Sequence, residues 1–178
     1  MRLPSSPRPA LLARARQNSG AVIVEALAAA MIIGLFMGGL FEMNALNLRT
    51  MRAGKETVAA SLVLQERLDQ VRNTTWANAS QSAYLRTILN SAAASASVLP
   101  QLTEQITVSA YPATSPMPTS AVVTRAANGS TAIVSSNADL SKLRTVRADV
   151  TISWRSSPRA KTRTRTLSTV IAEGGIVR

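Results

Sequence analysis

The 178-residue chain contains no cysteine and no histidine, and aromatic residues make up only 3% of it. Without cysteine it has neither disulfide bonds nor thiolate metal sites. Without histidine it lacks the commonest general base and the commonest metal ligand, which disfavours hydrolase and metalloenzyme chemistry. Asp139, Asp149 and Glu173 show no spacing typical of a catalytic carboxylate pair. We therefore expect a protein that is not an enzyme and that uses no metal and no cofactor.

Acidic residues are also scarce, 9 against 20 basic ones, which gives a net charge of +11. Arg2, Arg8, Arg14 and Arg16 precede a long apolar run with no acid among them. Basic residues before a hydrophobic span keep that end in the cytoplasm, so part of the excess charge is a membrane-topology signal.

A second basic group lies in strand-like sequence and consists of Arg144, Arg147, Arg155, Arg159, Lys161, Arg163 and Arg165. Because Trp154 is the one interleaved aromatic that could stack on a base, a solvated sheet face is favoured over a nucleic-acid site.

The apolar run extends from Ala21 to Phe41, 21 residues, which is near the ~20 needed to span a bilayer. It is too long for the hydrophobic region of a secretory signal peptide, and no A-x-A cleavage site follows it. Glu25 argues against a plain anchor, because an unpaired carboxylate within a span costs ~2.5–3.5 kcal/mol on insertion scales. This carboxylate therefore needs an explanation.

The helical pattern continues beyond the apolar run to about Asn73 without a proline. This second part is amphipathic. Its apolar side is predicted to carry Leu46, Ala60, Leu64, Leu68 and Val71, and its polar side Arg52, Lys55, Glu56, Glu66, Arg67 and Gln70. Gly34, Gly38 and Gly39 interrupt the apolar part and are candidate points of helix flexibility, since glycine costs ~1 kcal/mol against alanine in a helix. A helix of about 50 residues cannot be buried within one small domain, so its first half must contact lipid or other subunits.

Strand signals follow after a polar stretch with a short helix expected around Ser82–Leu89. The residues 104–111 alternate, and two short runs flank Asn128-Gly129, which is a hairpin turn signal. Residues 144–154 give the strongest alternation, and 161–171 are expected to return as an antiparallel partner. The proline-rich segment 112–120 is expected to be a loop. The predicted fold class is α+β, a long N-terminal helix packed on a small antiparallel sheet of three to five strands.

Gly20, four apolar residues and then Glu25, ahead of an uninterrupted apolar helix, resemble the signature of the type IV prepilin and type II secretion pseudopilin family. The closing residues 150–154 and 166–176 resemble those of PilV-like minor pilins. Ala21 and Val22 stand where members commonly have phenylalanine and threonine or serine. The resemblance implies that a membrane prepilin peptidase cleaves between Gly20 and Ala21 on the cytoplasmic side and N-methylates Ala21.

The resemblance also implies a division of the chain. Residues 1–20 are expected to be a cytoplasmic leader peptide that is removed, and 21–43 the transmembrane and assembly half of the helix. Residues 44–73 are expected to be its amphipathic half, and 74–178 a globular β domain. Cleavage creates an amine at Ala21, and Glu25 of one subunit is expected to pair with the amine of its neighbour and so fix the register of assembly.

The predicted function is a structural subunit, minor pilin-like, assembled through its N-terminal helix with other pilin or pseudopilin subunits into a type IV pilus. The expected location is the inner membrane, single-pass with a cytoplasmic N-terminus, and then a periplasmic or cell-surface filament. A minor pseudopilin of type II secretion and a non-assembling single-pass anchor with a binding domain stay open as alternatives. A basic nucleic-acid-binding protein is a third, less favoured class.

Overall fold

The computed structural model describes residues 10–112, 120–156 and 161–174. The chain divides into two compact units, residues 1–52 and 53–178. A long helix, α1 (Ala10–Arg72), contributes to both units. The second unit adds the rest of the helices and the sheet, so the architecture is α+β, as predicted.

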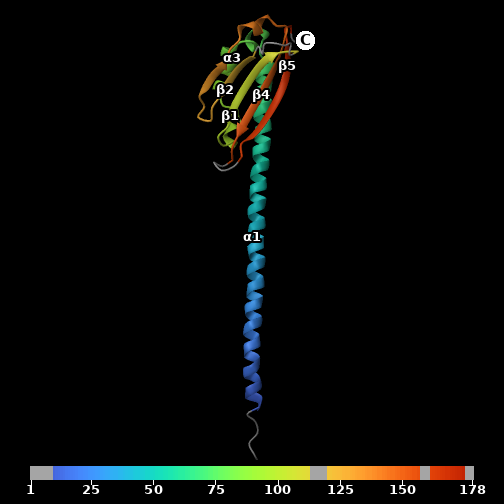
Figure 1. Cartoon of the computed structure of the whole chain (residues 1–178), viewed down its shortest axis with the longest axis vertical. Helices are drawn as coiled ribbons and strands as arrows, with labels where there is room; N and C mark the ends of the chain where they lie inside the picture. The colour runs from blue at the N-terminus through green and yellow to red at the C-terminus, as the bar shows by residue number, and fades with distance from the viewer. Residues whose placement is uncertain (1–9, 113–119, 157–160, 175–178) are drawn as a thin grey trace, which may run out of the picture. The chain divides into compact units, whose positions relative to one another are not determined.

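The helix α1 is 63 residues long (Figure 1). The sequence has no proline between Ala10 and Leu99, so no residue there lacks the backbone N–H that an α-helix needs. At the end of α1 the N–H of Asn73 donates to the carbonyl of Asp69 at 2.9 Å, and the Thr74 hydroxyl donates to the carbonyl of Gln70 at 2.9 Å. These bonds satisfy carbonyls that have no partner within the helix, and α1 ends there. The predicted helix end near Asn73 is confirmed.

Five antiparallel strands form one sheet in the order β3-β2-β1-β4-β5. Their bounds are β1 (Thr103–Ala110), β2 (Ser120–Arg125), β3 (Thr131–Ser135), β4 (Thr145–Trp154) and β5 (Arg163–Ala172). The central β1 pairs with β2 and with β4, and β4 and β5 pair over their full ten-residue lengths, from Thr145 opposite Ala172 to Trp154 opposite Arg163. All the predicted strands are present.

The β2–β3 hairpin turns at the predicted Asn128-Gly129 pair. Gly129 has φ of 85°, a left-handed conformation that glycine adopts without strain. The N–H of Ala126 donates to the carbonyl of Ser130 at 2.8 Å, and the Asn128 side chain accepts from the N–H of Ser130 at 3.0 Å. The local sequence therefore accounts for the connection between these strands.

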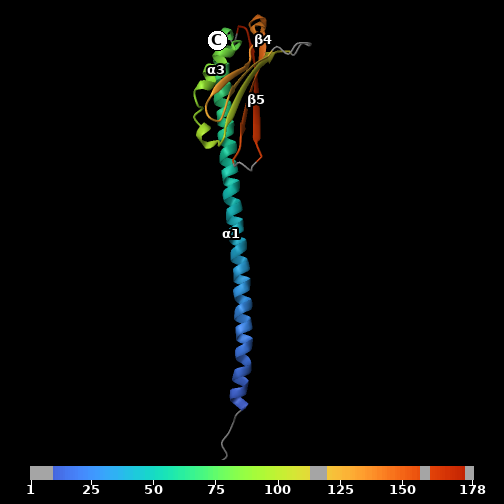
Figure 2. The ribbon, with the colours of Figure 1, turned by 60° about the vertical axis from the view of Figure 1, so that its left-hand side comes forward.

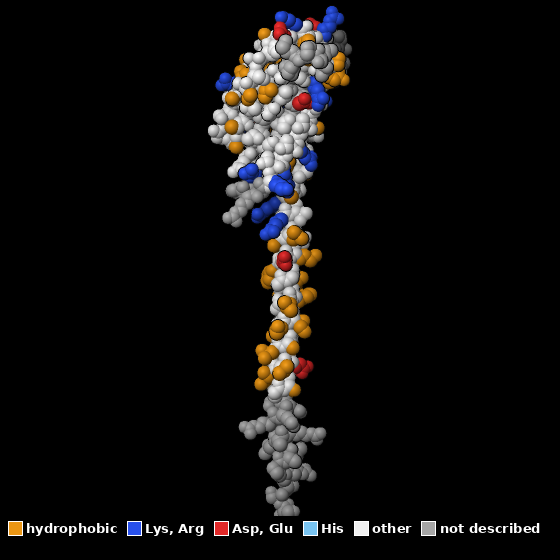
Figure 3. All heavy atoms as spheres, in the orientation of Figure 1, with side chains coloured by type: hydrophobic (Ala, Val, Ile, Leu, Met, Phe, Trp, Pro, Cys, Tyr) orange, Lys and Arg blue, Asp and Glu red, His pale blue; other side chains and the backbone are white. Residues whose placement is uncertain are grey.

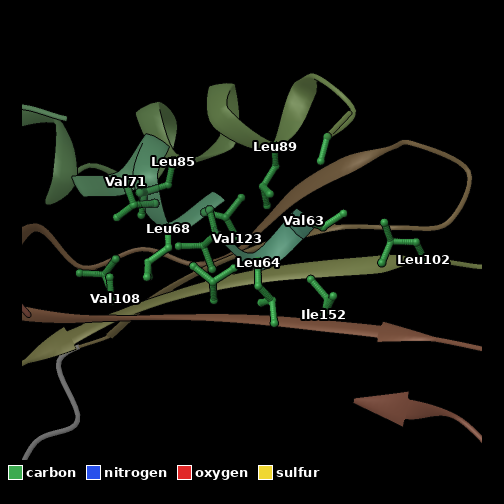
Figure 4. Close-up of a cluster of buried hydrophobic side chains, with 14 of the residues drawn as sticks. Val63, Leu64, Leu68, Val71, Leu85, Leu89, Leu102, Val108, Val123 and Ile152 are labelled. Carbon is green, nitrogen blue, oxygen red and sulfur yellow. The ribbon is translucent and has the colours of Figure 1, made fainter. Parts of the chain in front are cut away.

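One face of the sheet is buried against helices, and Figure 2 shows α1 and α3 (Ser82–Asn90) on the same side of the strands. Leu85 and Leu89 of α3 and Val63, Leu64, Leu68 and Val71 of α1 converge with Val108, Val123 and Ile152 of the strands (Figure 4). On β4 every second residue is buried, from Val146 to Trp154. This core is mainly aliphatic, as the low aromatic content requires.

Several local features differ from the sequence-based expectation or fall outside it. A short helix α2 (Trp76–Ala79) and two 3₁₀ turns, η1 (Ala96–Val98) and η2 (Ala138–Lys142), were not predicted. The helix near Ser82 is confirmed as α3. Most of the expected 112–120 loop, residues 113–119, lies outside the described residues, and so does Arg159.

The predicted polar side of α1 is partly wrong. Glu56 and Arg67 were placed on the solvated side, but both are buried. The physical reason is that each side chain has hydrogen-bond partners on other elements of the second unit, Glu104 for Arg67 and Trp154 for Glu56. Leu46, placed on the apolar side, is exposed.

Candidate functional site: the exposed helical segment and two buried carboxylates

Gly20, Ala21 and Glu25 lie within α1, which begins ten residues before Gly20. Every residue from Gly20 to Arg52 is exposed within the chain. Figure 3 shows hydrophobic side chains along the visible face of this part of α1. Phe36, Phe41 and Leu35 are 65%, 72% and 75% exposed, so the first unit presents an apolar surface that the described chain leaves uncovered.

Glu25 has no hydrogen bond and no ion pair to any residue that the structure describes. Its neighbours one turn away on α1 are Ala21 and Ala29, which carry no charged side chain. Two nearby residues, Val24 and Leu27, are 67% and 62% exposed. A single carboxylate therefore stands within a segment of exposed apolar side chains.

The glycines of this segment have no steric cause within the described chain. A Cβ atom added at Gly20, Gly34, Gly38 or Gly39 would meet nothing within 4 Å. The helix is continuous through all four positions. Neither the backbone conformation nor packing among the described residues therefore requires these glycines, although each one costs helical stability.

From Gly20 onward α1 is long and apolar enough to cross a membrane, by length and composition. None of the residues in its most apolar window is buried within the described structure. A buried core helix of a globular protein would pass the length test but not show this exposure. The helix is therefore a candidate membrane anchor.

A buried guanidinium lies at the centre of the second unit, where sequence reasoning placed an exposed residue. The side chains of Arg67 and Glu104 are 0% and 1% exposed, and Arg67 Nε donates to Glu104 Oε2 at 2.6 Å. Arg67 also donates to the carbonyl oxygens of Ile88 at 2.8 Å and Ser91 at 2.6 Å, at the end of α3. Arg125 Nη1 donates to Glu104 Oε1 at 2.9 Å. One arginine thus joins α1, α3 and β1.

A signal for this cluster is present in the sequence. Glu104 falls on the buried row of β1 with Ile106 and Val108, and Arg67 is spaced four residues from both Val63 and Val71 on α1. Residues four apart share a helix face, so the apolar pattern assigns Arg67 to the core side. A buried charge needs a buried partner, and Glu104 is the acid on the facing row.

The second buried carboxylate, Glu56, lies on α1. Its Oε2 accepts from the indole N–H of Trp154 at 3.2 Å and from the hydroxyl of Ser156 at 2.5 Å. Arg163 Nη1 lies 3.7 Å from the same oxygen. Glu56 therefore ties α1 to the end of β4 and to the start of β5.

The basic residues of the C-terminal strands do not form one patch. Arg147 lies on the outer sheet face, where Nε donates to Asp149 at 2.8 Å. Arg163 and Arg165 lie on the helix-facing side, because they stand opposite Trp154 and Ile152 in the β4–β5 register. Trp154 itself is 2% exposed and cannot stack on a base. The arrangement lacks the aromatic platform that single-stranded nucleic acid would use.

Among the described residues, no group of three or more acidic side chains is placed to hold a metal ion. Comparison with protein-family models, with curated proteins and with solved structures finds no match for this chain.

Proposed function

We propose that this chain is a prepilin-like structural subunit that is processed after Gly20 and assembled through its N-terminal helix into a filament of the type IV pilus or type II secretion class. A minor pilin is the favoured member of that class. The observation that carries the proposal is the unpaired Glu25 in an exposed apolar helix, five residues after Gly20. In a plain anchor the carboxylate only adds an insertion cost, whereas in an assembling subunit it can pair with a positive charge on a neighbouring subunit.

The chemistry of processing supplies a partner for Glu25. Cleavage of the peptide bond between Gly20 and Ala21 leaves a positive amine on Ala21. Glu25 is then the fifth residue of the shortened helix, about one turn from its new N-terminus. In an apolar assembly, the Ala21 amine of one subunit and Glu25 of the next lower each other's desolvation cost, and subunits that are out of register leave both charges unpaired.

The glycines and the exposed apolar surface support the same proposal. Gly34 and Gly38 form a G-x-x-x-G pattern, which allows two helices to approach closely in an apolar environment. The cost of these glycines is not recovered within the described part of the chain, because a Cβ there would meet nothing within 4 Å. Packing against the helices of other subunits would recover it.

The processing step is tested by the intact mass of the full chain extracted from membranes of cells that contain a prepilin peptidase. We expect loss of residues 1–20 and addition of one methyl group. Gly20→Leu should block the cut, because a side chain obstructs access to the scissile bond, whereas Gly54→Ala should be processed normally. Retention of the leader in the unsubstituted chain would contradict the proposal and favour the non-assembling anchor.

The assembly step is tested by two matched substitutions. Glu25→Gln and Glu42→Gln each remove one carboxylate from the exposed part of α1. We expect the Glu25 variant to be processed but to be lost from the sheared filament fraction, and the Glu42 variant to assemble. Equal assembly of both variants would show that Glu25 does not set the register.

A further inference from the structure

The two edge strands of the sheet, β3 and β5, differ in how well they are protected from pairing with another strand. At one edge, β3 has five residues, its register with β2 shifts between Val122 and Val123, and α3 lies against it. Thr131 on β3 is further tied to α3 through Asn90 and Arg86. Short, irregular and covered edges resist pairing with another strand. This edge is protected.

At the other edge, β5 is ten residues long, regular in its pairing with β4, and last in the strand order. It contains no proline. Three of its residues are threonine and two are valine or isoleucine, and these β-branched side chains favour an extended backbone. No other strand of the described chain pairs with its outer side. Its backbone groups on that side are therefore available to another strand.

The helix-facing row of β5 is only partly covered, in contrast to the row of β4 beside it. Val150 and Ile152 on β4 are fully buried, whereas their partners on β5, Leu167 and Arg165, are exposed. Between β5 and α1 there is a groove of about 260 Å³. It is lined by Ser61, Leu64, Gln65, Arg165, Thr166 and Leu167.

The β5 edge is positively charged, which favours a negatively charged partner. Lys161, Arg163 and Arg165 are exposed at one end, and residues 161–172 contain no acid, although Arg163 Nη1 lies 3.7 Å from Glu56 Oε2 of α1. Arg165 Nη1 is held over the groove by a hydrogen bond to the Ser61 hydroxyl at 3.1 Å, so one guanidinium has a fixed place beside the free edge. Opposite charges on neighbouring strands attract and like charges repel, which favours an acidic strand and disfavours a basic one or a second β5.

We propose that the free edge of β5 is a docking site for an extended, acidic segment of another protein, which adds to the sheet as a sixth strand. The carboxylates of this segment lie against Arg163 and Arg165, and an apolar side chain lies against Leu167 over the groove. Main-chain hydrogen bonds supply affinity and the alternating side chains supply specificity, as in other cases of strand addition. This inference does not depend on membrane insertion or on cleavage after Gly20.

The test uses the full chain in detergent micelles and three ten-residue peptides with strand-forming sequences. One peptide has glutamate at alternating positions of one half and valine in the other, the second has lysine in place of glutamate, and the third has two prolines in the glutamate peptide. Backbone hydrogen exchange is measured with each peptide at 1 mM. We expect slower exchange in β5 with the glutamate peptide and no change with the other two. Protection at β3, protection of β5 without peptide through self-association, or no protection of β5 would overturn the proposal.

Charge reversal provides the second arm. Arg163→Glu together with Arg165→Glu should weaken binding of the glutamate peptide, measured by fluorescence anisotropy, about tenfold, because attractive cross-strand pairs become repulsive. The same variant should bind the lysine peptide more tightly. Arg86→Glu on α3 is the control and should leave both affinities unchanged. Unchanged affinity in the double variant, with exchange in β4 showing an intact sheet, would contradict the proposed partner chemistry.

Discussion

The two parts of α1 differ in what surrounds them. From Gly20 to Arg52 every residue is exposed, whereas between Ala53 and Arg72 one face is buried in the second unit. Up to Phe41 the first part is apolar on every side apart from Glu25, whereas the second is apolar mainly on one side. A helix that is apolar on every side needs partners on every side, and a small sheet can cover only one. Among the described residues, packing against the sheet therefore stabilises only the second part of α1.

The charged residues of the two parts of α1 differ in the same way. In the packed part of α1, Glu56 and Arg67 each have partners from other elements, whereas Glu25 in the exposed part has none among the described residues. If this contrast is correct, substitutions in the packed part change folding stability and those in the exposed part do not. Both tryptophans, Trp76 and Trp154, lie in the second unit, so tryptophan fluorescence reports its unfolding selectively.

The largest effect is expected at Arg67. Arg67→Met should lower the free energy of unfolding by about 3–5 kcal/mol, because it leaves the Ile88 and Ser91 carbonyls without their donor and Glu104 with one cation fewer. Chemical denaturation of the full chain in detergent, followed by tryptophan fluorescence, measures it. Lys55→Met removes an exposed cation from the same helix and should change stability by less than about 0.5 kcal/mol. Equal costs for the two variants would show that the buried ion pair does not stabilise the fold.

A smaller effect is expected at Glu56. Glu56→Ala leaves the buried indole N–H of Trp154 without an acceptor and should cost about 1–3 kcal/mol. Glu56→Gln retains an amide oxygen at that place and should cost less. Fluorescence-detected unfolding gives the stabilities, and Asp69→Ala on the exposed face of α1 is the control. A glutamine variant as unstable as the alanine variant would mean that the negative charge, rather than the acceptor, is what Trp154 and Ser156 need.

The sequence predicted most of the fold because periodicity reports burial. Val146 to Trp154 alternate, Asn128-Gly129 marks a turn, and no proline interrupts α1, so these elements followed from local chemistry. Arg67 and Glu56 were misplaced for a different reason. Their burial depends on partners 37 and 98 residues away, Glu104 and Trp154, and a helical wheel that treats every charge as solvated cannot see them.

The candidate functional surfaces were likewise only partly predictable from the sequence. Glu25 was singled out as a charge within an apolar run, whereas the roles of Gly20 and Ala21 came from the resemblance of this stretch to the prepilin signature. The structure places all three residues in an exposed helix. The free edge of β5 was not identified, because a strand's position in the sheet order is a tertiary property. The alternation of threonine and arginine in residues 161–166 was interpreted only as an exposed face, yet Arg163 and Arg165 lie on the side of the sheet that faces α1.

A further prediction concerns an exposed ion pair of the second unit. The hydrogen bond from Lys142 to Asp139, at 2.8 Å, and then the charge of that carboxylate raise the pKa of the Lys142 ammonium above its ordinary value of 10.5. Asp139→Asn should lower this pKa, as measured by NMR titration of the lysine side chain, whereas Asp149→Asn should not change it. Salt at 1 M should diminish the rise. A pKa that is the same in both variants would show that the pair does not form.

The sign of this linkage is fixed by the raised pKa. Any stability that the pair contributes is fully present below the unfolded-state pKa of lysine and is lost as the pH rises through the folded-state value. Because both side chains are exposed, the pair should not change the unfolding midpoint measurably at neutral pH. Lys142 and Arg67 both form ion pairs, and the difference in their expected contribution to stability comes from their difference in exposure.

The smallest effect on folding is expected at Glu25. Glu25→Gln should leave the fluorescence-detected unfolding of the second unit unchanged within about 0.5 kcal/mol, because no described residue forms a hydrogen bond or an ion pair with this carboxylate. The matched control is Glu56→Gln, the same chemical change in the packed part of the same helix. A destabilised second unit in the Glu25 variant would contradict the contrast between the two parts of α1. An unchanged second unit combined with lost assembly would assign the cost of the Glu25 carboxylate to contacts between subunits, which is where the proposed amine of Ala21 offers a partner.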